Sequence, residues 1–406
     1  RPVRLRVEGP LAPFLGPYAE YLADRGYSQV SYWKKTFLIS EFSRWLGERR
    51  VAVGEITAEH EAAFLKHRAQ HRIIKQADPM ALSSMSGWLR DKGVVESAAD
   101  ASDEMSGIEV IVREYAGWLR EERGLAPSTI ENYTGYVGRF LVSIFSDQEP
   151  NLAVINASMV TDYIRGNAPR DQTFALAKNT VTSLRSFFRF ARYRDYIHID
   201  LAPVVPSVAG WSLASIPRAM PADDVRRLLI ESAKWRTPSG QRDHAILLLL
   251  ARLGLRAREV VRLELDDIDW SQGWLTVHGK GRQERPLPLP HDVGEALVSY
   301  LKDGRPECTC RRVFVRSRAP FDRLKSHSDV CQIVRRAIVR AGIDAKFGGA
   351  HQLRHALAVD MLRQGLSLTE IGQMLRHRSP EATRRYAKVD LDGLRAVALP
   401  WPGELL

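Results

Sequence analysis

The sequence predicts a mainly α-helical protein of several domains, with a small β-sheet confined to the last domain. Three observations support this prediction. Apolar residues recur at helical spacing through the first half, an acidic segment and a proline-rich segment interrupt the helical stretches, and apolar residues flank the basic turn Gly279–Gly281 as in two short strands. With 406 residues, 45% of them hydrophobic, the chain can form more than one buried core.

The first half contains a weak internal repeat. The copies match in three places that follow in one order: 18–26 with 115–124, 55–58 with 154–157, and 82–88 with 184–190. This order predicts two copies of one helical unit, in residues 1–95 and 107–200. Chance is the alternative, because Tyr, Leu and Ala are common in helices. In the second copy we expect Gly124 to end one helix and Ser128 to cap the next.

Two segments have the composition of linkers. Residues 96–109 are acidic and lack periodicity, and residues 202–221 contain four prolines. The segment that follows, 216–406, is predicted to form the last domain and to end in an apolar tail, 391–406. Its expected elements are strands at 274–278 and 285–289, and helices over 222–234 and 243–253 and near His291, Ser328, Leu353, Thr369 and Pro380.

Charge and composition limit the classes of function. The net charge is +11, and residues 201–406 contain 33 basic and 23 acidic residues. A polyanionic partner and a generically basic surface both fit this excess. No apolar run approaches the length of a membrane span and no signal peptide is evident, so we expect a cytoplasmic protein with no membrane partner. The three cysteines form no disulfide framework.

The last domain carries residue types that together suit attack on a phosphodiester. They are Arg256, Lys280, His351, Arg354, His377 and Tyr386, and Tyr386 follows His377 by nine residues. Each of them alone has an ordinary structural explanation. As a set they provide a nucleophile, two guanidinium groups, an amine and two imidazoles, which require no metal or cofactor.

Each group has an expected role in such a reaction. Tyr386 would be the nucleophile, because neighbouring cations favour the phenolate. Arg256 and Arg354 would hold the non-bridging oxygens. Lys280, between two glycines, could protonate the departing 5′ oxygen, His351 could take the Tyr proton, and His377 could hydrogen-bond the phosphate.

These motifs resemble those of the tyrosine recombinases, the phage integrase family, over roughly residues 107–390. The matching elements are Gly254-Leu-Arg256-x-x-Glu259, Gly279-Lys-Gly281, His351-x-x-Arg354-His355 and the pair His377 and Tyr386. The resemblance implies the roles given above and makes Glu259 and His355 supporting residues. It also implies a C-shaped DNA clamp formed by a helical, SAM-like core-binding domain, residues 107–200, and the catalytic domain. Residues 1–95 would be an extra copy, which makes two tandem helical domains, and could bind accessory DNA, extend the clamp or bridge protomers.

The resemblance further implies site-specific recombination of double-stranded DNA. Tyr386 would become linked to a 3′ phosphate, and a dimer on each site would form a tetramer on two sites that exchanges strands through a Holliday junction. Integration, excision and transposition of a mobile element all fit. The expected location is the cytoplasm, on the nucleoid when DNA is bound.

The sequence also departs from the family pattern and leaves alternatives. Arg258 and Arg376 replace residues that are usually small or uncharged, and with Arg282 they are hypothetical DNA contacts. A type IB topoisomerase and a binding-only factor are the alternative functions. Zinc sites are disfavoured, because Cys308 and Cys310 lack a second pair and Gln352 replaces the Glu of a metalloprotease motif.

Overall fold

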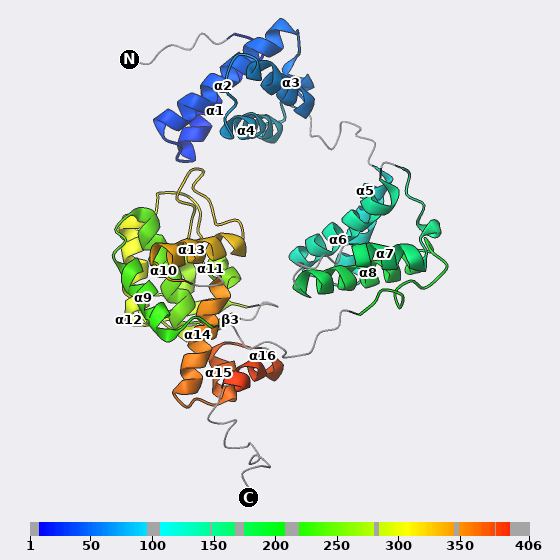
Figure 1. Ribbon diagram of the computed structural model, residues 1–406. Helices are drawn as coiled ribbons and strands as arrows, with labels where there is room; N and C mark the ends of the chain where they lie inside the picture. The colour runs from blue at the N-terminus through cyan, green and yellow to red at the C-terminus, as the bar shows by residue number, and fades with distance from the viewer. Residues whose placement is uncertain are drawn as a thin grey trace, which may run out of the picture. The chain divides into compact units, whose positions relative to one another are not determined.

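The computed structural model describes residues 8–95, 106–146, 148–166, 174–207, 219–279, 284–344, 349–377 and 379–389 (Figure 1). The chain divides into two compact units, one of residues 96–214 and one of residues 1–95 together with 215–406. Separate hydrophobic cores lie within residues 11–95, 108–205 and 220–386. The division into three domains stays a prediction. The two linkers lie partly, and the tail 391–406 wholly, outside the described residues.

The two halves of the predicted repeat have the same order of elements. The first contains α1 (Ala12–Asp24), α2 (Gln29–Glu48), a 3₁₀ turn η1 (Val53–Glu55), α3 (Ala58–Ala69) and α4 (Ala77–Asp91). The second contains α5 (Gly107–Glu121), α6 (Pro127–Phe145), a 3₁₀ turn η2 (Leu152–Val154), α7 (Ala157–Gly166) and α8 (Phe174–Tyr193). Both 3₁₀ turns occupy the same place between the second and third helices.

The buried aromatic contacts of the two copies are repeated as well. The ring centroids are 5.5 Å apart for Tyr18 and Trp88, 5.3 Å for Tyr115 and Phe190, 5.1 Å for Phe42 and Phe64, and 5.0 Å for Phe140 and Tyr163. Such pairs contribute beyond the area they bury. Equivalent contacts in equivalent helices support the predicted duplication.

One helix start differs from the prediction. Helix α6 begins at Pro127 and its N-cap residue is Ala126, so Ser128 lies in the first turn and is not the cap. Proline is suited to the first position because its fixed φ is helical and it has no N–H that needs a partner. Gly124 does end the preceding segment, with a φ of 57° that few other residues adopt.

The catalytic part of the sequence forms a helical layer around one long helix. Its helices are α9 (Ala222–Ala233), α10 (Pro238–Arg252), α11 (Ala257–Arg262), α12 (His291–Ser299), the π-helical η4 (Tyr300–Gly304), α13 (His327–Arg340), α14 (Ala350–Arg363), α15 (Leu368–Met374), α16 (Pro380–Arg384) and two 3₁₀ turns, η3 (Leu265–Asp267) and η5 (Arg385–Val389). Helix α10 begins five residues before the predicted start, because Thr237 caps it by accepting the Gly240 N–H.

A three-stranded antiparallel sheet lies beside these helices. Strands β1 (Ile268–Asp269), β2 (Trp274–His278) and β3 (Glu284–Pro288) pair in that order. The hairpin register pairs His278 with Glu284, and β2 directs Leu275 and Val277 into the core. The two predicted strands are therefore present, and residues 280–283 between them lie outside the described residues.

Helix α10 is the centre of the catalytic core. Every residue of Ala245–Ala251 is buried, and α9, α12, α13 and α14 pack against it. A run buried on all sides explains why the sequence shows no amphipathic pattern there. A second cluster joins α14 and α15 to Tyr386. The core thus fixes both the end of α10, which leads to Arg256, and the start of α14, which carries His351.

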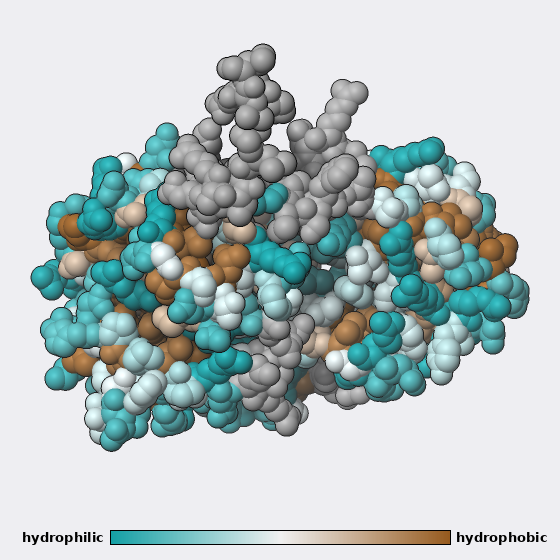
Figure 2. Space-filling model, turned by 90° about the horizontal axis from the view of Figure 1, so that it is seen from below, coloured by the Kyte–Doolittle hydropathy of each residue, from teal (hydrophilic) through white to brown (hydrophobic). Residues whose placement is uncertain are grey.

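Hydrophilic residues predominate on the face drawn in Figure 2, and hydrophobic residues lie dispersed among them. Among the described residues, no helix has both the length and the apolar character that a membrane crossing requires. The main polar feature is instead internal: Arg242, Glu259, Arg354 and Arg376 are charged side chains at most 8% exposed. Three of these four meet around one end of α10, at the candidate site.

Candidate active site

Arg256 is held at the start of α11 by the residue three positions later. Gly254, with a φ of 57°, turns the chain sharply at the end of α10, and Leu255 anchors it in the core. The Glu259 carboxylate accepts the Arg256 backbone N–H at 2.8 Å and its guanidinium at 2.6 Å. The side chain of Arg256 is 37% exposed. It is therefore oriented from inside the protein while its outer part faces solvent.

Arg376 completes this network from a second element. Its guanidinium donates to the Gly254 carbonyl and to Glu259 Oε2, both at 3.3 Å, and its own carbonyl accepts Arg256 Nη2 at 3.1 Å. Arg376 is 8% exposed and adopts a φ of 55°. The expected contact of Arg376 with DNA stays a prediction. In the structure Arg376 contacts Arg256 and Glu259, so it is placed to orient both side chains.

The Glu259 carboxylate is stabilised in its charged form. Burial alone would raise its pKa, but the backbone N–H of Arg256 and the charges of Arg376 and Arg256 outweigh burial and hold the pKa below its ordinary value. Glu259 was expected to be a supporting residue. Its contacts, which join two arginines from distant segments, are consistent with that expectation.

A pH-dependent stability difference is expected from replacing Glu259 by Gln. Because its folded pKa lies below the ordinary value of 4.5, the carboxylate stabilises the fold above pH 4.5, and this contribution is lost as the pH falls through the lower folded value. Glu259→Gln should therefore lower the free energy of unfolding by about 1–3 kcal/mol at pH 7. Urea unfolding at a series of pH values measures this; a difference that stayed constant into acid would contradict it.

Arg354 lies at the centre of the site. It is 2% exposed, and its two terminal nitrogens donate to the carbonyls of Gly254 and Leu375. Burial, then the charges of Arg256 and Arg376, lower its pKa to about 9, while Glu259 and Tyr386 oppose this shift. The guanidinium remains charged at neutral pH. Arg256, Arg376, Glu259 and Tyr386 are thus all close enough to act on Arg354.

The hydroxyl of Tyr386 is hydrogen-bonded inside the same chain. Tyr386 is 1% exposed, and its Oη lies 2.7 Å from His355 Nδ1. His351, the imidazole expected to take the Tyr proton, is exposed, and its ring centroid lies 5.2 Å from that of His355. His355 is thus one residue whose ring nitrogen lies within hydrogen-bond distance of the Tyr386 hydroxyl. The sequence placed His355 only as a support, because the contact spans 31 residues.

His377 also lies close to the Tyr386 ring. The two rings are parallel within 8°, with centroids 6.3 Å apart. His377 Nδ1 lies 2.7 Å from the hydroxyl of Thr383, which is 3% exposed. A Cβ on Gly372 would come within 3.0 Å of that hydroxyl. Thr383 therefore fixes the orientation of His377, a part that the sequence motifs did not reveal.

The structure describes only some of the remaining predicted site residues. Lys280 and Arg282 lie outside the described residues, although His278 and Glu284, which flank their turn, are paired in the hairpin and lie 3.4 Å apart at their side chains. Arg258 is exposed on α11. Within the described ranges, no three His, Cys, Asp or Glu side chains are arranged to hold a metal ion, so the zinc alternatives gain no support.

Comparison with known proteins places this site in a family. A model described as the phage integrase family matches residues 218–392, and one described as the phage integrase N-terminal SAM-like domain matches residues 112–195. A putative integrase/recombinase of Sinorhizobium fredii, y4rA, is 47% identical over 98% of this chain and 96% of the relative. The chain belongs to the phage integrase family. Members of this family, the tyrosine recombinases, are enzymes that transfer DNA strands.

Other tyrosine recombinases are similar at lower identity. The tyrosine recombinase XerA of Thermococcus kodakarensis is 30% identical over 72% of this chain and 95% of the relative. The XerH recombinase in a post-cleavage complex with its difH substrate aligns with a TM-score of 0.55 and 17% identity, covering 74% of this chain and 90% of that one. A lambda integrase tetramer bound to a Holliday junction aligns with a TM-score of 0.53 and 17% identity, covering 77% of this chain and 87% of that one. The predicted fold class is confirmed.

Proposed function

We propose that this tyrosine recombinase cuts and rejoins DNA at specific sites through a covalent link between Tyr386 and a 3′ phosphate. One observation carries the proposal. Tyr386, the neighbouring pair Arg354 and His355, and Arg256 come from three separate segments, yet Tyr386 bonds His355, and both Tyr386 and Arg256 act on the charge of Arg354. A phenol beside an imidazole and two guanidiniums suits attack on a phosphodiester.

The reaction balances without any further reagent. The Tyr386 oxygen forms a bond to phosphorus as the bond from phosphorus to the 5′ oxygen breaks. The phenol proton passes to an imidazole: His351 is the expected acceptor, and His355 Nδ1 lies 2.7 Å from the phenol oxygen. Lys280 donates a proton to the departing 5′ oxygen. The arginines stabilise the added charge on the non-bridging oxygens. The reverse attack by a 5′ hydroxyl, from the same or a partner duplex, reseals the strand.

The partners that we propose are duplex DNA and further copies of the chain. Solved relatives include the lambda integrase tetramer bound to a Holliday junction and XerH bound to its difH substrate. We infer that two copies bind each recombination site, that the SAM-like units and the catalytic domain clamp the duplex, and that four copies exchange strands between two sites. Because the substrate is genomic DNA, we place this activity in the cytoplasm, on the nucleoid. Integration, excision or transposition of a mobile element is the proposed outcome.

The test is a search for the covalent intermediate. The protein is incubated in EDTA with nicked duplexes that carry the DNA flanking its own gene, and the products are denatured. We expect a protein–DNA adduct that resists denaturation, and digestion should identify Tyr386 as the linked residue. A link at another residue, or no adduct on any flanking DNA, would reject the proposal. Formation of junctions between two duplexes separates recombination from simple relaxation and from binding alone.

A further inference from the structure

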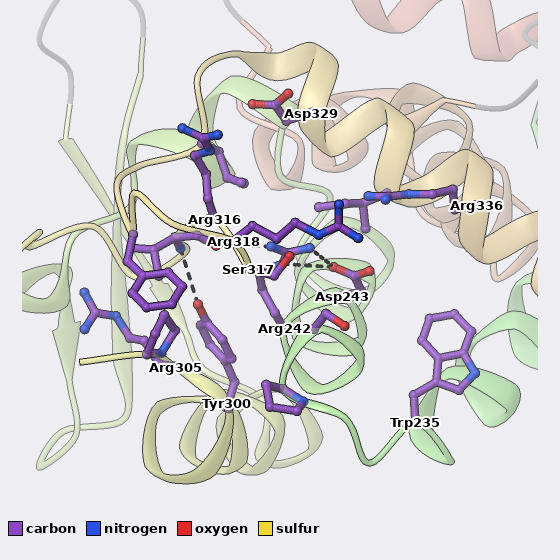
Figure 3. Close-up of a pocket in the computed structure, with 18 of the residues that line it drawn as sticks. Trp235, Arg242, Asp243, Tyr300, Arg305, Arg316, Ser317, Arg318, Asp329 and Arg336 are labelled. Atoms are coloured by element: carbon purple, nitrogen blue, oxygen red, sulfur yellow. Dashed lines mark hydrogen bonds and ion pairs between the residues drawn. The ribbon is translucent and has the colours of Figure 1, made fainter. Parts of the chain in front are cut away.

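A second basic site lies in the catalytic part of the chain, away from Tyr386. It is an open hollow of about 1200 Å³ between α10, η4, α13 and the loop of residues 305–325 (Figure 3). Its lining contains seven basic and three acidic residues. None of Arg256, Glu259, Arg354, His355 or Tyr386 lines it. The proposed cleavage mechanism therefore gives these basic residues no role.

The acidic groups of the hollow are largely engaged by the protein itself. Asp243 accepts the guanidinium of Arg242 at 2.7 Å, and Arg242, 5% exposed, also donates to the Val315 carbonyl. Asp329 accepts the backbone N–H groups that precede α13, at 2.7 and 3.3 Å. Asp303, at the rim, is the third acidic residue. Two of the three carboxylates thus serve the fold and leave little negative charge to face the hollow.

The basic groups, in contrast, are only partly balanced, because the single charge of Asp243 acts on Arg336 and Arg340 as well as on Arg242. In the part of the chain that the structure describes, no acidic side chain forms an ion pair with Arg316, Arg318, Lys325, Arg336 or Arg340. Figure 3 shows Arg318 and Arg336 extending toward one another from the loop and from α13, above the Arg242–Asp243 pair. Arg340 lies over the ring of Trp235 at 4.3 Å, which holds it at the edge of the hollow.

The convergence of like charges from two segments has a cost unless an anion lies between them. Guanidinium groups at this position suit phosphate oxygens, which they can bind through two N–H groups each. Helix α10 separates the hollow from the candidate active site. Arg242, in the lining of the hollow, lies about 15 Å along this helix from Arg252, and Arg256 follows shortly after Arg252. If one duplex contacts both the hollow and Arg256 along this direction, about four base pairs lie between the two contacts, at 3.4 Å for each base-pair step.

We propose that this hollow holds the phosphate backbone of the DNA duplex at a point several base pairs from the cleaved phosphodiester, with Arg318 and Arg336 as the principal contacts. The proposal rests on the proposed function, since it takes DNA as the substrate. It adds a contact that fixes the register of the duplex on the catalytic domain. Phosphate contacts of this kind position a protein on DNA without reading its sequence.

The test compares two double variants of the full chain. In Arg318→Ala/Arg336→Ala, duplex binding measured by fluorescence anisotropy should weaken on the order of 10-fold at moderate salt, and the slope of log affinity against log salt should fall by about 2. The control is Arg226→Ala/Arg363→Ala, which removes two other exposed arginines of the same unit. An equal loss in both variants would mean a generic basic surface and would overturn the proposal.

Two further measurements separate this proposal from neighbouring ones. At saturating protein, the Arg318→Ala/Arg336→Ala variant should still form the Tyr386 adduct; if wild type forms none, it is the proposed function that fails. Single methylphosphonate replacements should locate one phosphate, several base pairs from the cut, whose loss weakens wild type but not the variant. The same interference pattern in both proteins, or tight binding of inorganic phosphate with no effect on duplex binding, would overturn the DNA contact.

Discussion

Replacing Tyr386 by Phe should abolish the covalent protein–DNA adduct while the fold remains nearly intact. The substitution removes one oxygen, which is the proposed nucleophile and the partner of His355 Nδ1 at 2.7 Å. Loss of a nucleophile lowers turnover on the order of 10⁶-fold, so no adduct should be detectable. Loss of one hydrogen bond changes the free energy of unfolding by only about 1 kcal/mol. Denaturing gels and urea unfolding of the same preparation give both quantities.

Tyr300 provides the matched control for this experiment. It is equally buried, at 1% exposed, and its hydroxyl accepts the Val315 backbone N–H at 3.3 Å. Tyr300→Phe should lower stability to a similar extent and leave adduct formation close to wild type. If Tyr386→Phe formed the adduct, another nucleophile would be responsible. If Tyr300→Phe failed as well, the loss would reflect the fold and not the chemistry.

The second large effect is expected at Arg354. Replacing it by Met leaves the carbonyls of Gly254 and Leu375 without the guanidinium that both now contact. The two charged hydrogen bonds together contribute about 3–5 kcal/mol. For a domain of this size, the melting temperature should fall by about 6–15 °C. Cleavage should fall about 100–1000-fold, as for the loss of a group that stabilises transition-state charge.

Arg242 separates the structural from the chemical part of that effect. Like Arg354 it is buried, at 5% exposed, and it bonds a backbone carbonyl, that of Val315. Arg242→Met should lower the melting temperature but, assayed well below it and at a protein concentration that saturates the DNA, should cleave at close to the wild-type rate. Arg354→Lys should keep the charge yet fail to restore both carbonyl contacts, because an ammonium group lacks the planar fork. Full activity of Arg354→Met below its melting temperature would contradict the assigned role.

The sequence motifs predicted the composition of the site better than its internal contacts. Arg256, Arg354, His377 and Tyr386 could be predicted as candidates because they are residue types that suit attack on a phosphodiester and stand in short motifs that resemble those of the family. The bond between His355 and Tyr386 joins two elements of the tertiary fold, and no local pattern encodes it. The departure at Arg376 was visible in the sequence. Its burial was not, because an arginine is usually exposed and only the fold shows the Gly254 carbonyl and Glu259 beside it.

The same distinction applies to the fold. Repeated apolar spacing predicted both helical copies, since amphipathic helices carry a local signal. The first turns of α10, from Pro238 to Arg242, carry no apolar repeat, and the helix begins five residues before the predicted start because Thr237 caps it. The basic hollow could not be foreseen. Its residues extend from Trp235 to Arg340, and only the packing of α10 against α13 brings them to one place.

The burial of Tyr386 has a consequence for timing. A phenol that is 1% exposed and bonded to His355 has no path to a phosphate until it leaves its place among α14 and α15. Uncovering such a ring costs about 2–3 kcal/mol, and breaking the bond adds about 1 kcal/mol. A binding partner that favours the exposed arrangement would shift this equilibrium toward it. A protomer in this state would be inactive and would not cleave genomic DNA that it contacts only transiently.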